Sequence, residues 1–182
     1  AMDFSFRTTP NREKLMVLHF IDEASKYHTA QVIREGKVNN YSDLGNCDAP
    51  DLIKAISEWA RYMQHPSCFH VDEEGCFHSE QFKDYCGLKA IEVKMAAGEA
   101  HWQNGIVERH IGTFRELLNK LLLEDPFEGA TNQTIVDSVC EAKNRNGTYN
   151  GTSPSQWLLG RNRHLLIDTS EASPHDHEGI CL

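Results

Sequence analysis

Several features that define other classes of protein are missing from this sequence. No apolar run approaches the roughly 20 residues that span a bilayer, and the first residues lack the basic-then-apolar pattern of a signal peptide. None of the six cysteines belongs to a C-x-x-C pair, so the pattern indicates neither a zinc site nor a redox motif. We therefore expect an intracellular protein without a membrane segment, whose cysteines are buried free thiols.

An excess of basic residues is missing as well. The 182 residues include 18 lysines and arginines against 27 aspartates and glutamates, which gives a formal net charge of −9. Such a charge is unfavourable for a protein that grips a phosphate backbone. The objection weakens if some of the acidic residues hold metal ions, or if basic flanking domains belong to the same longer protein.

What is present is typical of a packed globular domain. Apolar residues make up 40% of the chain and charged residues 25%, and a chain of this length buries a sizeable core in one domain. We expect that domain over residues 1–165, followed by an acidic tail over 166–182. His175 and His177 in this tail have no partners at metal-ligand spacing, so we expect them to be solvated.

Apolar runs separated by turn residues predict five strands. The predicted strands cover residues 2–6, 15–21, 27–33, 69–72 and 89–93. The run 15–21 is nearly continuous in apolar residues, as in a strand buried on both faces. Residues 34–47 are rich in turn formers, which predicts a loop with at most a weak edge strand.

Apolar stripes at helical spacing predict helices between and after these strands. Asp48 can cap a helix that ends before Pro66, and a short helix is expected over residues 79–85. From His101 a long helix carries one apolar face, formed by Val107, Ile111, Phe114, Leu118 and Leu121. Thr131 can cap a further helix. This order of strands and helices predicts a mixed sheet with helices packed on it, all around one core.

Two acidic residues lie where such a fold would present them to a common site. Asp72 ends a predicted strand and Glu108 lies near the start of the long helix, with 35 residues between them (108 − 72 − 1). Carboxylates delivered from separate elements can converge on a hard cation such as magnesium, which prefers oxygen ligands. Spacing alone does not establish such a site.

The residues around these acids resemble the catalytic core of retroelement integrases, and the 35-residue gap is the signature of that family. The resemblance runs from residue 2 to about 161. Its second-aspartate block is Asp72, Glu73, Glu74, Gly75, Cys76 and Phe77, followed by Ser79 and Phe82. Its glutamate block is Gln103, Asn104, Gly105, Ile106, Val107, Glu108 and Arg109. Two further matches are Asp22, Ser25, Lys26 and Tyr27, and the closing segment Tyr149, Asn150, Ser153, Pro154 and Gly160.

The first aspartate of the family's triad has two candidates, Asp3 and Asp22. In an RNase H-like sheet the first strand runs parallel to the strand that ends in Asp72, whereas the second strand is antiparallel and one place further out. An acid at the end of the second strand would then lie at the opposite end of the sheet and on the order of 10 Å sideways. We therefore expect Asp3 to match the first metal ligand, and Asp22 to be a turn residue that bonds backbone amides near Ser25.

The resemblance implies a fold, a chemistry and a set of partners. The fold is α/β, an RNase H-like mixed five-stranded sheet of order 3-2-1-4-5 flanked by helices. The activity is metal-dependent DNA 3′-end processing and strand transfer, with Asp3, Asp72 and Glu108 as catalytic residues that hold two Mg²⁺ or Mn²⁺ ions. The partners are element-end and target DNA and further copies of the core. The family's zinc-binding and C-terminal domains are missing from this chain, and the active protein is expected in the nucleus, as part of a larger polyprotein.

Departures from the family pattern keep other interpretations open. The family has glycine two positions after its second aspartate, whereas Glu74 stands here, so Glu73 and Glu74 crowd the predicted site. An interaction module that has lost catalysis and a metal-dependent nuclease that only cuts are the alternatives. The candidate contacts with nucleic acid are Lys94, Gln103, Asn104 and Arg109. Arg109 is as well suited to a surface ion pair with Glu99 or Glu116.

Overall fold

Short turns between apolar runs produce an antiparallel meander of three strands. The computed structural model describes residues 1–9, 11–72, 75–95, 101–124, 129–149 and 151–160, with side chains described from 105 to 122 in the long helix. The meander strands are β1 (Met2–Thr8), β2 (Lys14–Ile21) and β3 (His28–Gly36). Two parallel strands, β4 (Cys68–Val71) and β5 (Glu92–Met95), extend the sheet beyond β1, which gives the order β3-β2-β1-β4-β5. The predicted sheet and its order are confirmed.

Side-chain caps start most of the helices at the positions that the sequence predicts. The helices are α1 (Ala49–Met63), α2 (Glu80–Leu88), α3 (His101–Glu124), α4 (Asn132–Asn146) and α5 (Pro154–Leu159), with short 3₁₀ turns η1 (Tyr41–Leu44) and η2 (Gly75–His78). The side chains of Asp48, Ser79, Thr131 and Ser153 each accept a hydrogen bond from the backbone N–H three residues along.

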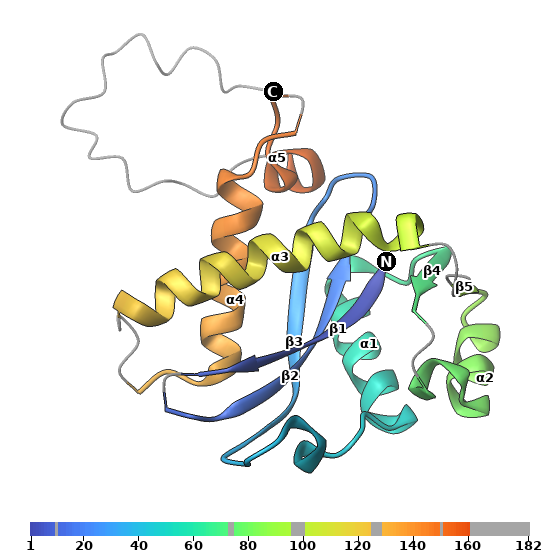
Figure 1. Ribbon diagram of the computed structural model, residues 1–182. Coiled ribbons are helices and arrows are strands. Elements are labelled where there is room, and N and C mark those ends of the chain that lie inside the picture. Colours follow the sequence, from blue (N-terminus) through green and yellow to red (C-terminus); the bar gives the residue numbers. More distant parts are fainter. Residues whose placement is uncertain (10, 73–74, 96–100, 125–128, 150, 161–182) are drawn as a thin grey trace, which may run out of the picture.

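Helices cover both faces of the sheet, α1 and α2 on one face and α3 and α4 on the other (Figure 1). On the first face, side chains such as Phe20 and Val71 pack with Leu52 and Phe82. On the second face, Phe114 and Leu118 of α3 pack with Val17 of β2 and with α4. The predicted burial of Val17, Phe20, Val71, Ile111, Phe114 and Leu118 is confirmed. The prediction of one core is wrong, because successive strand residues point to opposite faces and divide these side chains between separate clusters.

Side-chain amides from α4 close the free edge of β3. Asn144 accepts from the His28 N–H and donates to the His28 carbonyl, at 2.9 and 2.7 Å. Gln133 accepts from the Val32 N–H at 2.7 Å and donates to the Ala30 carbonyl at 3.0 Å. The outward backbone groups of an edge strand otherwise invite another strand to pair with them. The side-chain amides of Asn144 and Gln133 occupy some of these backbone groups, which another strand would otherwise bond.

The segment 34–47, predicted to be a loop, contains the end of β3 and the 3₁₀ turn η1. Two local details differ from the expectations. β5 begins at Glu92, later than predicted, and the short helix α5 was not predicted. The acidic tail, with His175 and His177, lies outside the described residues. No helix in the described part of the chain combines the length and apolar character that a membrane span needs.

Candidate metal centre

Two of the predicted metal ligands occupy neighbouring strands at the same level. Met2 of β1 pairs in parallel register with Val71 of β4, so the residues that follow them, Asp3 and Asp72, come next to each other. Met2 and Val71 are buried on the α1 and α2 face, and alternation therefore directs Asp3 and Asp72 to the other face. Asp3 is partly buried and Asp72 is exposed. This placement of two carboxylates is what a shared cation requires.

Asp22 is a turn residue, as expected. Its carboxylate accepts hydrogen bonds from the backbone N–H and the hydroxyl of Ser25, at 2.7 and 2.5 Å. Burial alone would raise the pKa of Asp22, but the hydrogen bonds from Ser25 outweigh it and lower that pKa. The carboxylate therefore already has a structural role in the turn between β2 and β3.

The expected position of Asp22 at the opposite end of the sheet is wrong. Phe20 pairs with Met2, so Asp22 lies just beyond the first residue of β1, at the same end as Asp3. The cause is that both neighbouring strands, β2 and β4, end beside the start of β1. Register still separates Asp22 from Asp72 by three residue levels and two strand spacings, which is about 10 Å in each direction.

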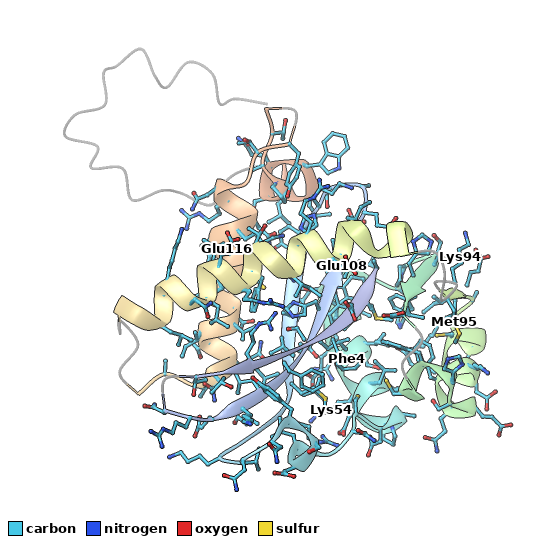
Figure 2. The ribbon with its side chains drawn as sticks, viewed as in Figure 1. Phe4, Lys54, Lys94, Met95, Glu108 and Glu116 are labelled. Carbon is cyan, nitrogen blue, oxygen red and sulfur yellow. The ribbon has the colours of Figure 1, made fainter. Side chains whose placement is uncertain are left out.

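Glu108 lies on the first turns of α3, the part that crosses the start of β1 (Figure 2). Its neighbour Val107 is buried in a cluster with Ile21 and Ile111, against which Ala1 packs. The Glu108 side chain itself is exposed. Helix α3 therefore brings this carboxylate to the end of the sheet that carries Asp3 and Asp72.

The three acids do not form a complete ligand group. Among the residues that the structure describes, no cluster of three or more carboxylate, histidine or cysteine side chains could hold a metal ion. Glu73 and Glu74, the extra acids of this segment, lie outside the described residues. The donor chemistry of Asp3 and Asp72 fits a hard cation.

The sheet beside these acids is open on the α3 side. Along β4 and β5 the side chains of His70, Glu92 and Lys94 are exposed, whereas Phe69 and Val71 are buried on the other face. Lys94 Nζ lies 3.4 Å from a Glu92 carboxylate oxygen, and His70 Nδ1 lies 2.5 Å from a Glu23 oxygen. An extended ligand could therefore reach Asp72 over this surface, where Lys94 supplies the positive charge.

The other predicted nucleic-acid contacts lie on α3. Arg109 is exposed, one residue beyond Glu108. Gln103 and Asn104 belong to the first turn of the helix, where the backbone is described and the side chains are not. All three therefore lie at the end of α3 that carries Glu108.

A buried polar cluster that the sequence did not predict lies beneath α3. Ser5 Oγ lies 2.6 Å from His19 Nε2, and His19 Nδ1 lies 2.9 Å from His28 Nε2. Beside them Lys143 Nζ donates a hydrogen bond to His110 Nδ1. The only signal in the sequence is that His19 interrupts an apolar run predicted to be buried on both faces.

Burial keeps the histidines of this cluster uncharged at neutral pH. It lowers the pKa of His19 to about 3 and that of His110 to about 4, with the positive charge of Lys143 acting in the same direction. Burial also lowers the pKa of Lys143 to about 8. None of these groups contacts the open surface, since all are buried. The cluster therefore supports the sheet and α3 rather than acting as a second site.

No family model matches the sequence, and a comparison with curated proteins finds no match either. Solved structures do match in fold. The class that they define is the RNase H-like fold of retroviral integrase catalytic cores, with the same mixed five-stranded sheet flanked by helices.

Three of these structures illustrate the likeness. The catalytic core of HTLV-2 integrase, in a dimeric form with magnesium, has a TM-score of 0.66 and 18% identity, over 88% of this chain and 93% of that chain. A chain of the simian T-cell lymphotropic virus intasome, in complex with the PP2A regulatory subunit B56 gamma, has a TM-score of 0.69 and 17% identity, over 90% of this chain and 54% of that chain. The BIV integrase core has a TM-score of 0.62 and 16% identity, over 87% of this chain and 93% of that chain.

Proposed function

We propose that this chain is the catalytic core of a retroelement integrase, a polynucleotidyl transferase that processes DNA 3′ ends and joins them to target DNA. The observation that carries the proposal is the placement of Asp3 and Asp72 at one level of adjacent parallel strands, beside the start of the helix that carries Glu108. The fold shared with integrase cores supports this interpretation.

The three acids would divide the work of holding divalent ions. The resemblance implies that Asp3 contacts two Mg²⁺ or Mn²⁺ ions, Asp72 one of them and Glu108 the other. Such ions would supply charge neutralisation at the attacking and leaving oxygens of an in-line displacement. The protein's part is to place the carboxylates on rigid strands and to let α3 bring Glu108 to them. The HTLV-2 core, which has this fold, is known in complex with magnesium.

DNA and further copies of the chain are the proposed partners. Lys94 lies on the open surface beside Asp72, and Arg109, Gln103 and Asn104 lie beside Glu108. With a net charge of −9, these residues alone give a weak grip on phosphates, so basic flanking domains are part of the proposal. The chain spans about half of the matched intasome chain. The HTLV-2 core is known in dimeric and trimeric forms, which supports self-association.

A second candidate function is an interaction module that keeps the fold without catalysis. It is favoured by the acidic net charge and by the lack, among the described residues, of a group of three side chains that could hold a metal ion. The nuclease alternative has no observation of its own here and differs from the integrase only in the nucleophile. An assay that scores cutting and joining separately distinguishes all three.

The test is Glu108→Gln, with Glu116→Gln as the matched control two turns further along α3, where the side chain is also exposed (Figure 2). The substitution keeps the size of the side chain and removes a charged oxygen ligand. We expect it to reduce metal-dependent joining of oligonucleotides by at least about a hundredfold, while Glu116→Gln joins at the wild-type rate. Thermal melts with and without Mg²⁺ or Mn²⁺ report ion binding and show that both variants fold.

Two results would contradict the proposal. Joining at wild-type rates by the Glu108→Gln variant would remove Glu108 from the site. Wild-type chain with neither a metal-dependent melting shift nor any cutting or joining would favour the interaction module.

A further inference from the structure

Two cysteines line one cavity on the α1 and α2 face of the sheet. Cys47 immediately precedes Asp48, the N-cap of α1, and Cys76 lies in η2, four residues after Asp72. Both side chains are partly buried and pack against the apolar cluster on the α1 and α2 face. Both also line one cavity of about 430 Å³, which reaches Met16 and Ser79. The fold thus brings together two thiols that are 29 positions apart in the sequence (76 − 47).

The two thiols line the same cavity. Interaction with the Cys76 side chain, together with burial, raises the pKa of the Cys47 thiol, whose Sγ also donates to the Asp48 carbonyl at 3.4 Å. Both cysteines are free, and the other described cysteines lie elsewhere, Cys68 on β4, Cys86 on α2 and Cys140 on α4. Two thiols that line one cavity and act on each other's titration are suited to form a disulfide, provided that their Cα atoms lie within about 7 Å.

We infer that Cys47 and Cys76 form a redox-sensitive pair, in which oxidation to a disulfide ties the segment after Asp72 to the start of α1. With a peroxide as the oxidant, one thiolate attacks an oxygen of the peroxide, which breaks the O–O bond, forms a sulfenic acid and releases water. The second thiol then attacks the sulfenic sulfur, an S–S bond forms and a second water leaves. Two thiols lose two electrons, and the peroxide gains them.

Oxidation has a consequence for the candidate site. Helix α1 is anchored to the core through Leu52 and Ile56, both fully buried. A covalent bond from its start to Cys76 restricts the approach of η2, and with it the position that Asp72 can take when an ion or DNA binds. This regulatory consequence rests on the proposed function, whereas the disulfide itself does not.

Burial of the two thiols also makes their oxidation slow. A thiol with a raised pKa has little thiolate at neutral pH, and the thiolate is the form that reacts. The pair therefore responds to a sustained change in redox balance and not to a brief pulse of oxidant. A test must therefore measure the ratio of disulfide to free thiols at equilibrium and not the initial rate of oxidation.

The experiment equilibrates the whole chain in glutathione buffers that range from reducing to oxidising, until the product ratio is constant. Free thiols are then blocked with an alkylating agent, and the digested protein is searched for the peptide that links Cys47 to Cys76. Matched variants are Cys47→Ser, Cys76→Ser and Cys68→Ser, the last removing a partly exposed thiol on β4. A fourth sample, unfolded in denaturant, shows which pairs form without the fold.

We expect the Cys47–Cys76 link to dominate in wild type and in Cys68→Ser, to reverse on reduction, and to be absent from the other two variants. The oxidised wild type should melt a few degrees higher, because the bond closes a long loop. Two results would overturn the inference: both thiols remaining open to alkylation at the oxidising end, or folded chain giving the same mixture of links as unfolded chain. Failure of the reduced chain to join DNA would instead contradict the proposed function and leave the disulfide result intact.

Discussion

The two faces of the sheet are built from different chemistry. Beneath α1 and α2 the buried side chains are apolar, with aromatic rings such as Phe77 and Phe82 at the centre. Beneath α3 and α4 the apolar cluster adjoins buried histidines and Lys143. The apolar face needs only to exclude water, whereas the polar face has to satisfy each of its donors and acceptors.

The apolar face therefore contributes mainly to stability, whereas the candidate site lies on the polar face. The carboxylates of Asp3 and Asp72 are directed to the polar face, and Glu108 lies on α3, the helix that covers this face. The apolar face anchors the strands without contributing any of these acids. We therefore expect substitutions on the two faces to have effects of different kinds, which the following measurements separate.

The largest effect on stability is expected from Phe82→Ala on the apolar face. Phe82 is fully buried and packs edge to face against Phe77, with ring centroids 5.7 Å apart. Its removal leaves a cavity and should lower the free energy of unfolding by about 3 to 5 kcal/mol, measured by denaturant titration. Tyr62→Ala, at a side chain 88% exposed on α1, is the control and should change it by less than about 0.5 kcal/mol. Equal losses of unfolding free energy in the two variants would show that Phe82 does not contribute to a core on this face.

The polar face should make stability depend on pH. Burial, with the charges of Arg7 and Lys143, lowers the pKa of His19 from 6.5 to about 3 in the folded chain. Between these values the unfolded chain binds a proton that the folded chain does not, so stability present above pH 6.5 is lost as the pH falls. The loss for His19 alone between pH 6.5 and 4 is on the order of 3 kcal/mol.

Replacement of that histidine tests the origin of the pH dependence. His19→Leu should flatten the curve of unfolding free energy against pH over this window, whatever its effect at neutral pH. His78→Leu, at an exposed histidine in η2, should leave the slope unchanged. An unaltered slope in His19→Leu would assign the acid sensitivity to other groups.

The smallest effect on stability is expected from Lys94→Ala on the open surface of β5. Its pair with Glu92 is exposed on both sides, and such pairs contribute at most about 1 kcal/mol. If the surface receives DNA, the variant should bind it more weakly, with a salt dependence reduced by about one phosphate contact. Lys54→Ala is the control, an exposed lysine on α1 at the other face (Figure 2). Identical salt slopes for both variants would exclude Lys94 from the interface.

The strands and most helices were predictable because their signals are local. Alternation in β1, the apolar run of β2 and the caps Asp48, Ser79 and Thr131 each act within a few residues. The sheet order came from the resemblance and not from these signals. α5 was not predicted, because Ser153 and Pro154 are of residue types common in turns, whereas here they form the N-cap and first residue of a short helix.

The candidate site was predictable only in part, because convergence is a tertiary property. Asp3 lies beside Asp72 because Met2 pairs with Val71 in the sheet. The positions of the two acids in the family's motifs had predicted this neighbourhood. The place of Asp22 was misjudged because no sequence pattern states where two strands meet along their lengths. Cys47 and Cys76 line one cavity because of the way α1 packs, and the histidines are buried because of the way α4 packs. No spacing in the sequence reveals either packing.

The amides that close the edge of β3 also impose an order on the assembly of the chain. Their hydrogen bonds join residues that are 101 to 116 positions apart, so a chain made from its N-terminus completes the meander long before α4 exists to cover it. During that interval the outward backbone groups of His28, Ala30 and Val32 are exposed to other nascent chains. Exposed edge groups of this kind can pair with another chain and start aggregation. The edge of β3 is thus covered by Gln133 and Asn144 only after α4 has been synthesised.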